Sequence, residues 1–241
     1  AHGVAAQRCA ALTALARRGE RDGPFLVIAT ASAVAQRAPP RARIAGAAYA
    51  ARAGEESSMQ DLEAYLVVNG YSRSSTVRAP GEFAVRGGLI DIYPPGAAEP
   101  LRFDFFGDAL ESIRSFDAET QRTLLTMRGL DLVPVSEFQL VTETIRRFRM
   151  GYVAAFGAPE RDDMLYEAGS EGRRHPGMEH WLPLFHDRLD TLFDYLGEAP
   201  VAIEPQGEDA ARERFKQIND YYEARREALE HRGGGAIYKP L

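Results

Sequence analysis

The sequence predicts an α/β protein in which a parallel sheet flanked by helices is interrupted by an inserted antiparallel β-rich unit. Residues 24–30 (PFLVIAT) are continuously apolar, which is typical of a strand buried on both faces of a sheet. Residues 71–135 consist of short alternating segments separated by Pro-Gly, Gly-Gly and Gly-Asp pairs, a pattern typical of antiparallel hairpins. We therefore expect residues 1–57 and 136–241 to form two parts of one α/β domain, and residues 58–135 to form the insert.

The first part of the predicted α/β domain reads as helix, strand and helix. Residues 4–18 carry apolar side chains at helical spacing, and residues 32–37 form a short helix that ends before a Pro-Pro pair. The apolar strand at 24–30 lies between them. The insert then opens with a helix over residues 58–69, in which Ser58 is the N-cap and a glycine follows the last residue.

After the insert, the pattern returns to helices and strands. We expect helices at 143–156 and 161–168, strands at 191–196 and 200–204, and a long charged helix at 208–230 that ends at an Arg-Gly-Gly-Gly sequence.

Composition favours a protein partner over nucleic acid. The chain has 241 residues, with 29 basic and 35 acidic side chains and a net charge of −6, whereas a freestanding nucleic-acid binder needs a basic surface to neutralise phosphates. The single cysteine, Cys9, excludes an internal disulfide and lies on the apolar stripe of the first helix. We see neither a leader nor a run of about 18 apolar residues, so we expect a cytoplasmic protein that does not enter a membrane.

No set of residues predicts catalysis. Nucleotide hydrolysis needs a glycine-rich loop followed by lysine and a hydroxyl, whereas the glycines at 233–235 are followed by alanine and isoleucine. We interpret them as a flexible helix exit. Cys9 has no local histidine partner, and adjacent acid pairs such as Asp162 and Asp163 do not face each other on a helix.

A metal site is also disfavoured. His175, His180 and His186 are five and six residues apart, which fits neither a helical pair nor a short finger loop. We prefer a structural turn around Trp181 and predict no metal and no cofactor.

The segment at residues 101–106 carries the functional information. Side chains alternate between the faces of a strand, so one face takes Leu101, Phe103 and Phe105 and the other takes Arg102, Asp104 and Phe106. A phenylalanine among charges on the polar face is typical of an interface anchor. The alternative is that Phe106 only covers the end of the hairpin.

The register of this hairpin follows from its loop. If PPGAAE forms the loop, Arg102 lies opposite Asp91, Phe106 lies opposite Gly87, and Arg86 lies beside Phe106. Two arginines and a phenylalanine then share one face.

Two further features of this face are open to more than one interpretation. Gly87 and Gly88 leave the surface open for another chain to approach. Arg102 is either a partner contact or a simple cross-strand pair with Asp91, worth about 0.2 to 1 kcal/mol, and both can hold together.

Four sequence runs resemble a known family. GEFAVRGGLIDIYPPG and PLRFDFFGDALESIRSFDAETQR resemble the small domain through which UvrB and the bacterial transcription-repair coupling factors (Mfd) bind UvrA. SEGRRHPGMEHWLPLFHDRLDTLFDYL and YYEARREAL resemble the coupling factors and not UvrB. The ATP-binding loop and the tyrosine-rich DNA-clamping hairpin of UvrB have no counterpart here, so the coupling factors are the better match.

The resemblance implies a degenerate nucleotide-hydrolase-like α/β domain that carries a UvrA-binding insert. It implies a non-catalytic docking module that recruits UvrA to RNA polymerase stalled at DNA lesions. In complete coupling factors, other domains bind RNA polymerase and double-stranded DNA and hydrolyse ATP, and a C-terminal domain masks the UvrA-binding face. The expected UvrA contacts are Arg86, Arg102 and Phe106, supported by Gly87, Gly88 and Asp91.

Two alternatives stay open. In the first, the α/β part is a DNA-damage-binding or ATP-binding element, as it is in UvrB. In the second, the region is mainly autoinhibitory. In each case we expect a monomer in the bacterial cytoplasm.

Overall fold

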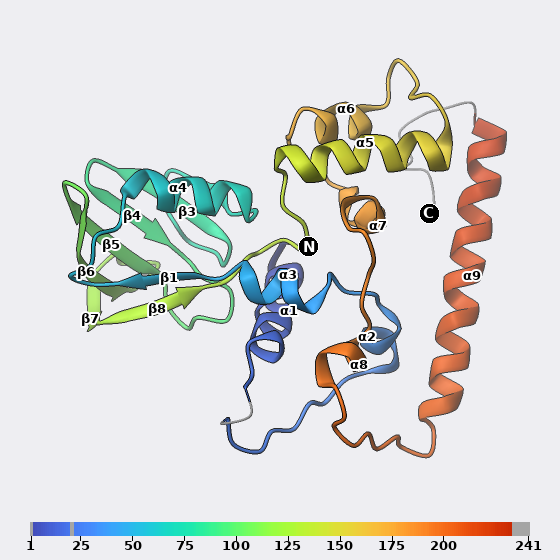
Figure 1. Ribbon diagram of the computed structural model, residues 1–241, viewed down its shortest axis with the longest axis horizontal. Helices are drawn as coiled ribbons and strands as arrows, with labels where there is room; N and C mark the ends of the chain where they lie inside the picture. The colour runs from blue at the N-terminus through green and yellow to red at the C-terminus, as the bar shows by residue number, and fades with distance from the viewer. Residues whose placement is uncertain (1, 20–21, 233–241) are drawn as a thin grey trace. The chain divides into compact units, whose positions relative to one another are not determined.

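The computed structural model describes residues 2–19 and 22–232, which form two compact units (Figure 1). The first unit comprises Ala1–Arg17 and Ala42–Gln139, and the second comprises Arg18–Arg41 and Leu140–Leu241. The predicted class is confirmed, because helices are combined with a mixed sheet and an antiparallel sheet and the β-rich part is inserted between helical segments. The expected domain limits at 57/58 and 135/136 stay predictions.

A six-stranded sheet dominates the first unit. Its strand order is β2-β3-β4-β5-β6-β7, in which β2 and β3 are parallel and all other neighbours are antiparallel. The expected hairpins between residues 71 and 135 are thus present. The strands are β2 (Ser72–Arg73), β3 (Glu82–Arg86), β4 (Leu89–Ile92), β5 (Leu101–Phe106), β6 (Ala109–Phe116) and β7 (Thr123–Met127).

Helices and a second sheet complete this unit. They are α1 (His2–Ala16), α3 (Arg41–Gly46), α4 (Met59–Val68) and the antiparallel pair of β1 (Tyr49–Arg52) with β8 (Gly129–Leu132). The expected cap of α4 is confirmed, because Ser58 Oγ accepts hydrogen bonds from the backbone N–H groups of Gln60 and Asp61. Gly70 follows the helix with a φ of 90°, a conformation that glycine adopts without strain.

The core of the first unit lies between α4 and one face of the sheet. Leu62 and Leu66 of α4 belong to the same buried cluster as Ile90, Phe103 and Ile113, all of which are 0% exposed. The predicted alternation along β5 is confirmed as well. Leu101, Phe103 and Phe105 are 4%, 0% and 7% exposed, whereas Phe106 is 76% exposed.

Helix α1 confirms the first predicted helix. Its buried face includes Ala6, Leu12 and Cys9, whereas Val4 is 74% exposed. Cys9, a free thiol, is 0% exposed, as expected for a small core residue. Arg17 at the end of the helix and Arg52 of β1 both pair with Asp131 of β8 at 2.8 Å. This three-residue cluster connects α1 to the two-stranded sheet.

The second unit is built from helices around an aromatic core. Phe148 stacks on Phe185 with 4.9 Å between ring centroids, and Tyr152 meets Tyr166 and Trp181 at 4.6 and 5.5 Å. Trp181 is 1% exposed, so the histidine-rich segment does form a turn around it. The elements are α2 (Ala31–Ala35), α5 (Thr142–Phe156), α6 (Met164–Ser170), the 3₁₀ helix Met178–Trp181, α7 (Leu182–Phe185), α8 (Leu192–Leu196) and α9 (Gly207–Arg232).

Two strands expected from apolar composition are wrong. Residues 24–30 and 200–204 form no strand, and Leu26, Ile28 and Ile203 are 83%, 88% and 68% exposed. A strand requires a neighbour to accept and donate its backbone hydrogen bonds, and no described strand lies beside either segment. Apolar residues alone do not supply that neighbour.

The strand expected at residues 191–196 is also wrong, because this segment is helix α8. The Thr191 hydroxyl accepts from the Asp194 N–H, and the Asp194 carboxylate accepts from the Thr191 N–H. This reciprocal capping starts a helix and outweighs the β propensity of the residues that follow.

The last expected helix is confirmed by α9, whereas the glycines at 233–235 lie outside the described residues. None of the helices in the described part of the chain combines the length and apolar character needed to cross a membrane.

Candidate functional site

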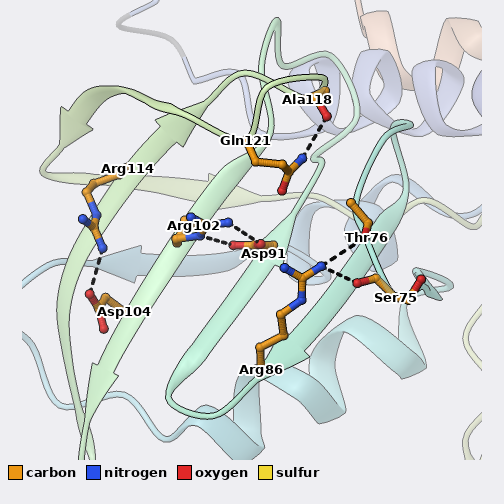
Figure 2. A network of polar contacts seen from close by, with 9 residues as sticks. All are labelled: Ser75, Thr76, Arg86, Asp91, Arg102, Asp104, Arg114, Ala118 and Gln121. Atoms are coloured by element: carbon orange, nitrogen blue, oxygen red, sulfur yellow. Dashed lines mark hydrogen bonds and ion pairs between the residues drawn. The ribbon is translucent and has the colours of Figure 1, made fainter.

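The candidate site is the outer face of the six-stranded sheet, which lies opposite the α4 core (Figure 2). Directly paired residues in antiparallel strands point to the same face. The pairing places Ala84, Asp91, Arg102 and Arg114 in one row across β3, β4, β5 and β6. The outer face is therefore polar and charged at its centre.

Phe106 ends β5 at the edge of this face. It pairs with Ala109 across a tight turn in which Gly107 has a φ of 60°. The side chain has no place in the core, since 76% of its surface is exposed. Its position at the tip of a hairpin makes it available to another protein.

Arg102 is held rigidly. Its Nε and Nη2 donate to the two carboxylate oxygens of Asp91 at 2.7 Å each, and its guanidinium lies 4.8 Å from the ring centre of Phe116. Asp91 is only 3% exposed, and the Arg102 side chain is 19% exposed. The hydrogen bond to Asp91 raises the pKa of Arg102, so this guanidinium stays charged.

Arg86 at the end of β3 is exposed but not loose. Its Nη2 donates to Thr76 Oγ1 at 3.1 Å and to the Ser75 carbonyl, as Figure 2 shows. These bonds fasten the loop between β2 and β3 to the sheet. Val77 of the same loop is fully buried against the outer face, where it packs with Ala84 and Phe116.

The two glycines expected to support the site have different roles. Gly87 has a φ of 58° and open space where a Cβ would lie, which agrees with the expected open surface. At Gly88, a Cβ would lie 2.8 Å from the carbonyl oxygen of Phe105, whose N–H donates to the Gly88 carbonyl. Gly88 therefore allows a close backbone approach within the chain itself.

The structure confirms the predicted register. Asp91 pairs with Arg102 as expected. The ladder of β4 with β5 ends at Leu89 and Asp104, and the hydrogen bond from the Phe105 N–H to the Gly88 carbonyl continues the same register by one residue. The position of Phe106 opposite Gly87 stays a prediction. The three site residues differ in exposure, since Arg102 is largely covered whereas Arg86 and Phe106 are exposed.

Arg114 is a residue of this face that sequence reasoning missed, whereas strand alternation had already placed its partner Asp104 there. Arg114 of β6 donates from Nη2 to Asp104 of β5 at 2.8 Å, and both side chains are about one third exposed. A β-bulge at the start of β6 places Arg114 there, because it shifts the pairing with β5 by one residue. The sequence carries a signal for this bulge. Leu110 and Ile113, which are both buried, are three residues apart, whereas core residues of a regular strand are an even number of residues apart.

The described residues contain no grouping of three or more histidine, cysteine, aspartate or glutamate side chains suited to hold a metal ion. Near the predicted turn, burial lowers the pKa of His180, which favours the neutral ring.

Sequence comparison identifies the kind of domain that carries this face. Residues 50–138 match the family model of the UvrB interaction domain.

Over most of its length, the chain is homologous to transcription-repair coupling factors. It is 38% identical over 175 residues to that of Haemophilus influenzae, 33% over 214 residues to that of Rickettsia bellii, and 31% over 192 residues to that of Escherichia coli. These alignments cover 72%, 89% and 79% of this chain but only 15%, 19% and 17% of the relatives. The resemblance found in the sequence is thereby confirmed, and the chain spans less than one fifth of these relatives.

Proposed function

We propose that this chain is the docking module through which a transcription-repair coupling factor recruits UvrA to RNA polymerase stalled at DNA lesions. The observation that carries the proposal is Phe106, a 76% exposed aromatic side chain on a rigid hairpin within the matched UvrB interaction domain. Aromatic and arginine side chains dominate binding hot spots. UvrA therefore contacts Phe106 together with Arg86 and Arg102.

The environment of these residues supports binding by a preorganised surface. Arg102 is fixed by Asp91, and Arg86 is fixed by the Ser75–Thr76 loop, so little side-chain freedom is lost when a partner arrives. The fragment performs no catalysis and needs no cofactor. RNA polymerase, double-stranded DNA and ATP are bound by other regions of the longer protein, in the bacterial cytoplasm.

Masking of the same face by a C-terminal domain of the longer protein is a compatible second role. An exposed aromatic at the tip of a hairpin is costly to leave in water, which favours an intramolecular cover when UvrA is absent. One face then serves two partners in turn.

The alternative of an ATP-binding or DNA-binding element has less support. The sequence has no lysine and hydroxyl after a glycine-rich loop, and its net charge is −6. Both features oppose binding of phosphates.

The test is a calorimetric titration of the chain with purified UvrA at low and at high salt. We expect saturable binding in which each docking surface of UvrA takes up one chain. High salt should weaken the affinity, because it screens the charges of the contacting arginines. Absence of binding by a folded chain contradicts the proposal. A titration of the Phe106→Ala variant serves as the matched control.

A further inference from the structure

The outer face holds a pair of like charges that folding alone does not explain. Arg102 and Arg114 are direct cross-strand partners on β5 and β6, and side chains in such positions start about 5 Å apart. Like charges in directly opposite positions destabilise a sheet. Their presence at the centre of this face indicates that another requirement selects them.

Each arginine of this face uses only some of its N–H donors within the chain. Arg102 uses Nε and Nη2 for Asp91, Arg114 uses Nη2 for Asp104, and Arg86 uses Nη2 for the loop at residues 75–76. A guanidinium carries five N–H donors, so each of the three keeps donors for a further acceptor. The Arg114 Nε is buried and has no hydrogen-bond partner in the described part of the chain.

The hydrogen bonds of this face involve three guanidinium groups, from Arg86, Arg102 and Arg114, but only two carboxylates, those of Asp91 and Asp104. Glu82, on the same side of β3, instead accepts from the backbone N–H groups of Arg78 and Ala79. Asp91 is 3% exposed, whereas Arg114 and Asp104 are about equally exposed. Arg86 and Arg102 are therefore cations whose partners within the described residues are neutral or buried.

We infer that Arg86, Arg102 and Arg114 form one carboxylate-binding surface on the outer face, that Arg114 is a further UvrA-contacting residue, and that the docking segment of UvrA carries aspartate or glutamate side chains. The inference rests on the proposed function and names the chemistry of its partner. Carboxylates match the planar fork of arginine with paired hydrogen bonds. Complementary charge also speeds encounter and excludes partners of the wrong sign.

The experiment compares Arg114→Ala, Arg114→Lys and Arg114→Glu with wild type in calorimetric titrations against purified UvrA, at low and at high salt. We expect Arg114→Glu to weaken binding by about tenfold or more, because repulsion adds to the lost hydrogen bonds. Arg114→Ala weakens it less and reduces the salt dependence. Arg114→Lys should bind more tightly than Arg114→Ala but less tightly than wild type, since lysine keeps the positive charge but lacks the planar guanidinium group.

The matched control is Arg73→Glu. Arg73 is also an ion-paired surface arginine, but its partner Glu63 belongs to α4, on the other side of the sheet. We expect this variant to bind UvrA as wild type does. Thermal melting accompanies every titration, and the Arg114 variants should stay folded because a partly exposed surface ion pair adds little to stability.

Three outcomes would contradict the role inferred for Arg114. If Arg114→Glu binds normally while Phe106→Ala binds weakly, this inference fails and the docking proposal stands. If Arg73→Glu weakens binding as much as Arg114→Glu, the effect is one of overall charge and the inference fails. If wild type does not bind UvrA, both the inference and the docking proposal fail.

Discussion

Phe106 and Phe103 lie three residues apart on β5 but differ in exposure. Phe106 is 76% exposed, whereas Phe103 is fully buried. Strand alternation produces the difference, and it allows binding and folding to be tested separately.

Replacing Phe106 by alanine should weaken UvrA binding by about 2 kcal/mol or more, the usual range for a hot-spot aromatic. The melting temperature should change little, because the side chain is already in water in the free protein. Calorimetry and thermal unfolding of the same sample measure both quantities. A variant that melts early, or one that binds normally, contradicts this prediction.

Arg102 should behave differently from Phe106, because its ion pair with Asp91 is largely buried. Arg102→Ala leaves the Asp91 carboxylate without its partner, and breaking a buried pair costs about 3 to 5 kcal/mol. Both stability and binding should therefore fall, as measured by chemical unfolding and by titration with UvrA.

A double variant distinguishes these two effects. Asp91→Leu with Arg102→Met replaces the pair by apolar side chains, an exchange that is often neutral for stability. We expect the double variant to regain stability but not UvrA affinity. Recovery of both would mean that Arg102 acts only through the fold.

At the scale of the element, β5 contributes its inner face to the core between the sheet and α4. Phe103→Ala should destabilise the first unit by about 3 to 5 kcal/mol, because it leaves a cavity among Leu62, Ile90 and Ile113. The check is denaturant unfolding, with Phe106→Ala as the control on the same strand. Equal stability of the two variants contradicts the assignment of faces.

The junction of α1 with β1 and β8 gives a prediction about pH. A hydrogen bond from Arg52, helped by the charge of Arg17, lowers the pKa of Asp131 below its ordinary 3.8. A carboxyl whose pKa is lowered on folding stabilises the fold above its unfolded pKa, and this contribution is lost as pH falls through the folded pKa. Asp131 should therefore stabilise the unit fully above about pH 4 and progressively less below it.

The variant Asp131→Asn tests this. The difference in unfolding free energy between wild type and variant should be constant near neutral pH and should shrink below about pH 4. Glu111→Gln, at an exposed carboxylate of β6, is the control. A difference that does not vary with acidity would show that the ion pairs of Asp131 do not stabilise the fold.

At the scale of the whole molecule, the chain should bind neither ATP nor DNA with useful affinity. It has no lysine after a glycine-rich loop and an excess of acidic over basic side chains. Calorimetry with ATP and gel shifts of a labelled duplex at physiological salt check this prediction. A micromolar nucleotide site, or tight salt-sensitive binding of the duplex, would instead favour the UvrB-like alternative.

Local rules succeeded where local interactions decide the structure. The Ser58 cap, the helix α4 and the alternation of β5 follow from neighbouring residues, and the structure confirms them. The strand predicted at residues 24–30 is wrong because a strand depends on a partner strand elsewhere in the chain. The strand predicted at residues 191–196 is wrong because reciprocal capping between Thr191 and Asp194, which is a feature of the sequence itself, starts a helix there.

The sequence by itself determined that Phe106 faces outward, that Arg102 pairs with Asp91, and that this hairpin resembles a UvrA-binding domain. Each conclusion depends on strand alternation or on residues a few positions apart. Only the tertiary structure decided that Arg102 is mostly covered and that Arg114 shares its face. The bulge in β6 places Arg114 on this face, because one extra residue reverses which side chains face outward. Asp91 and the ring of Phe116, which come from two other strands, hold Arg102 against the sheet.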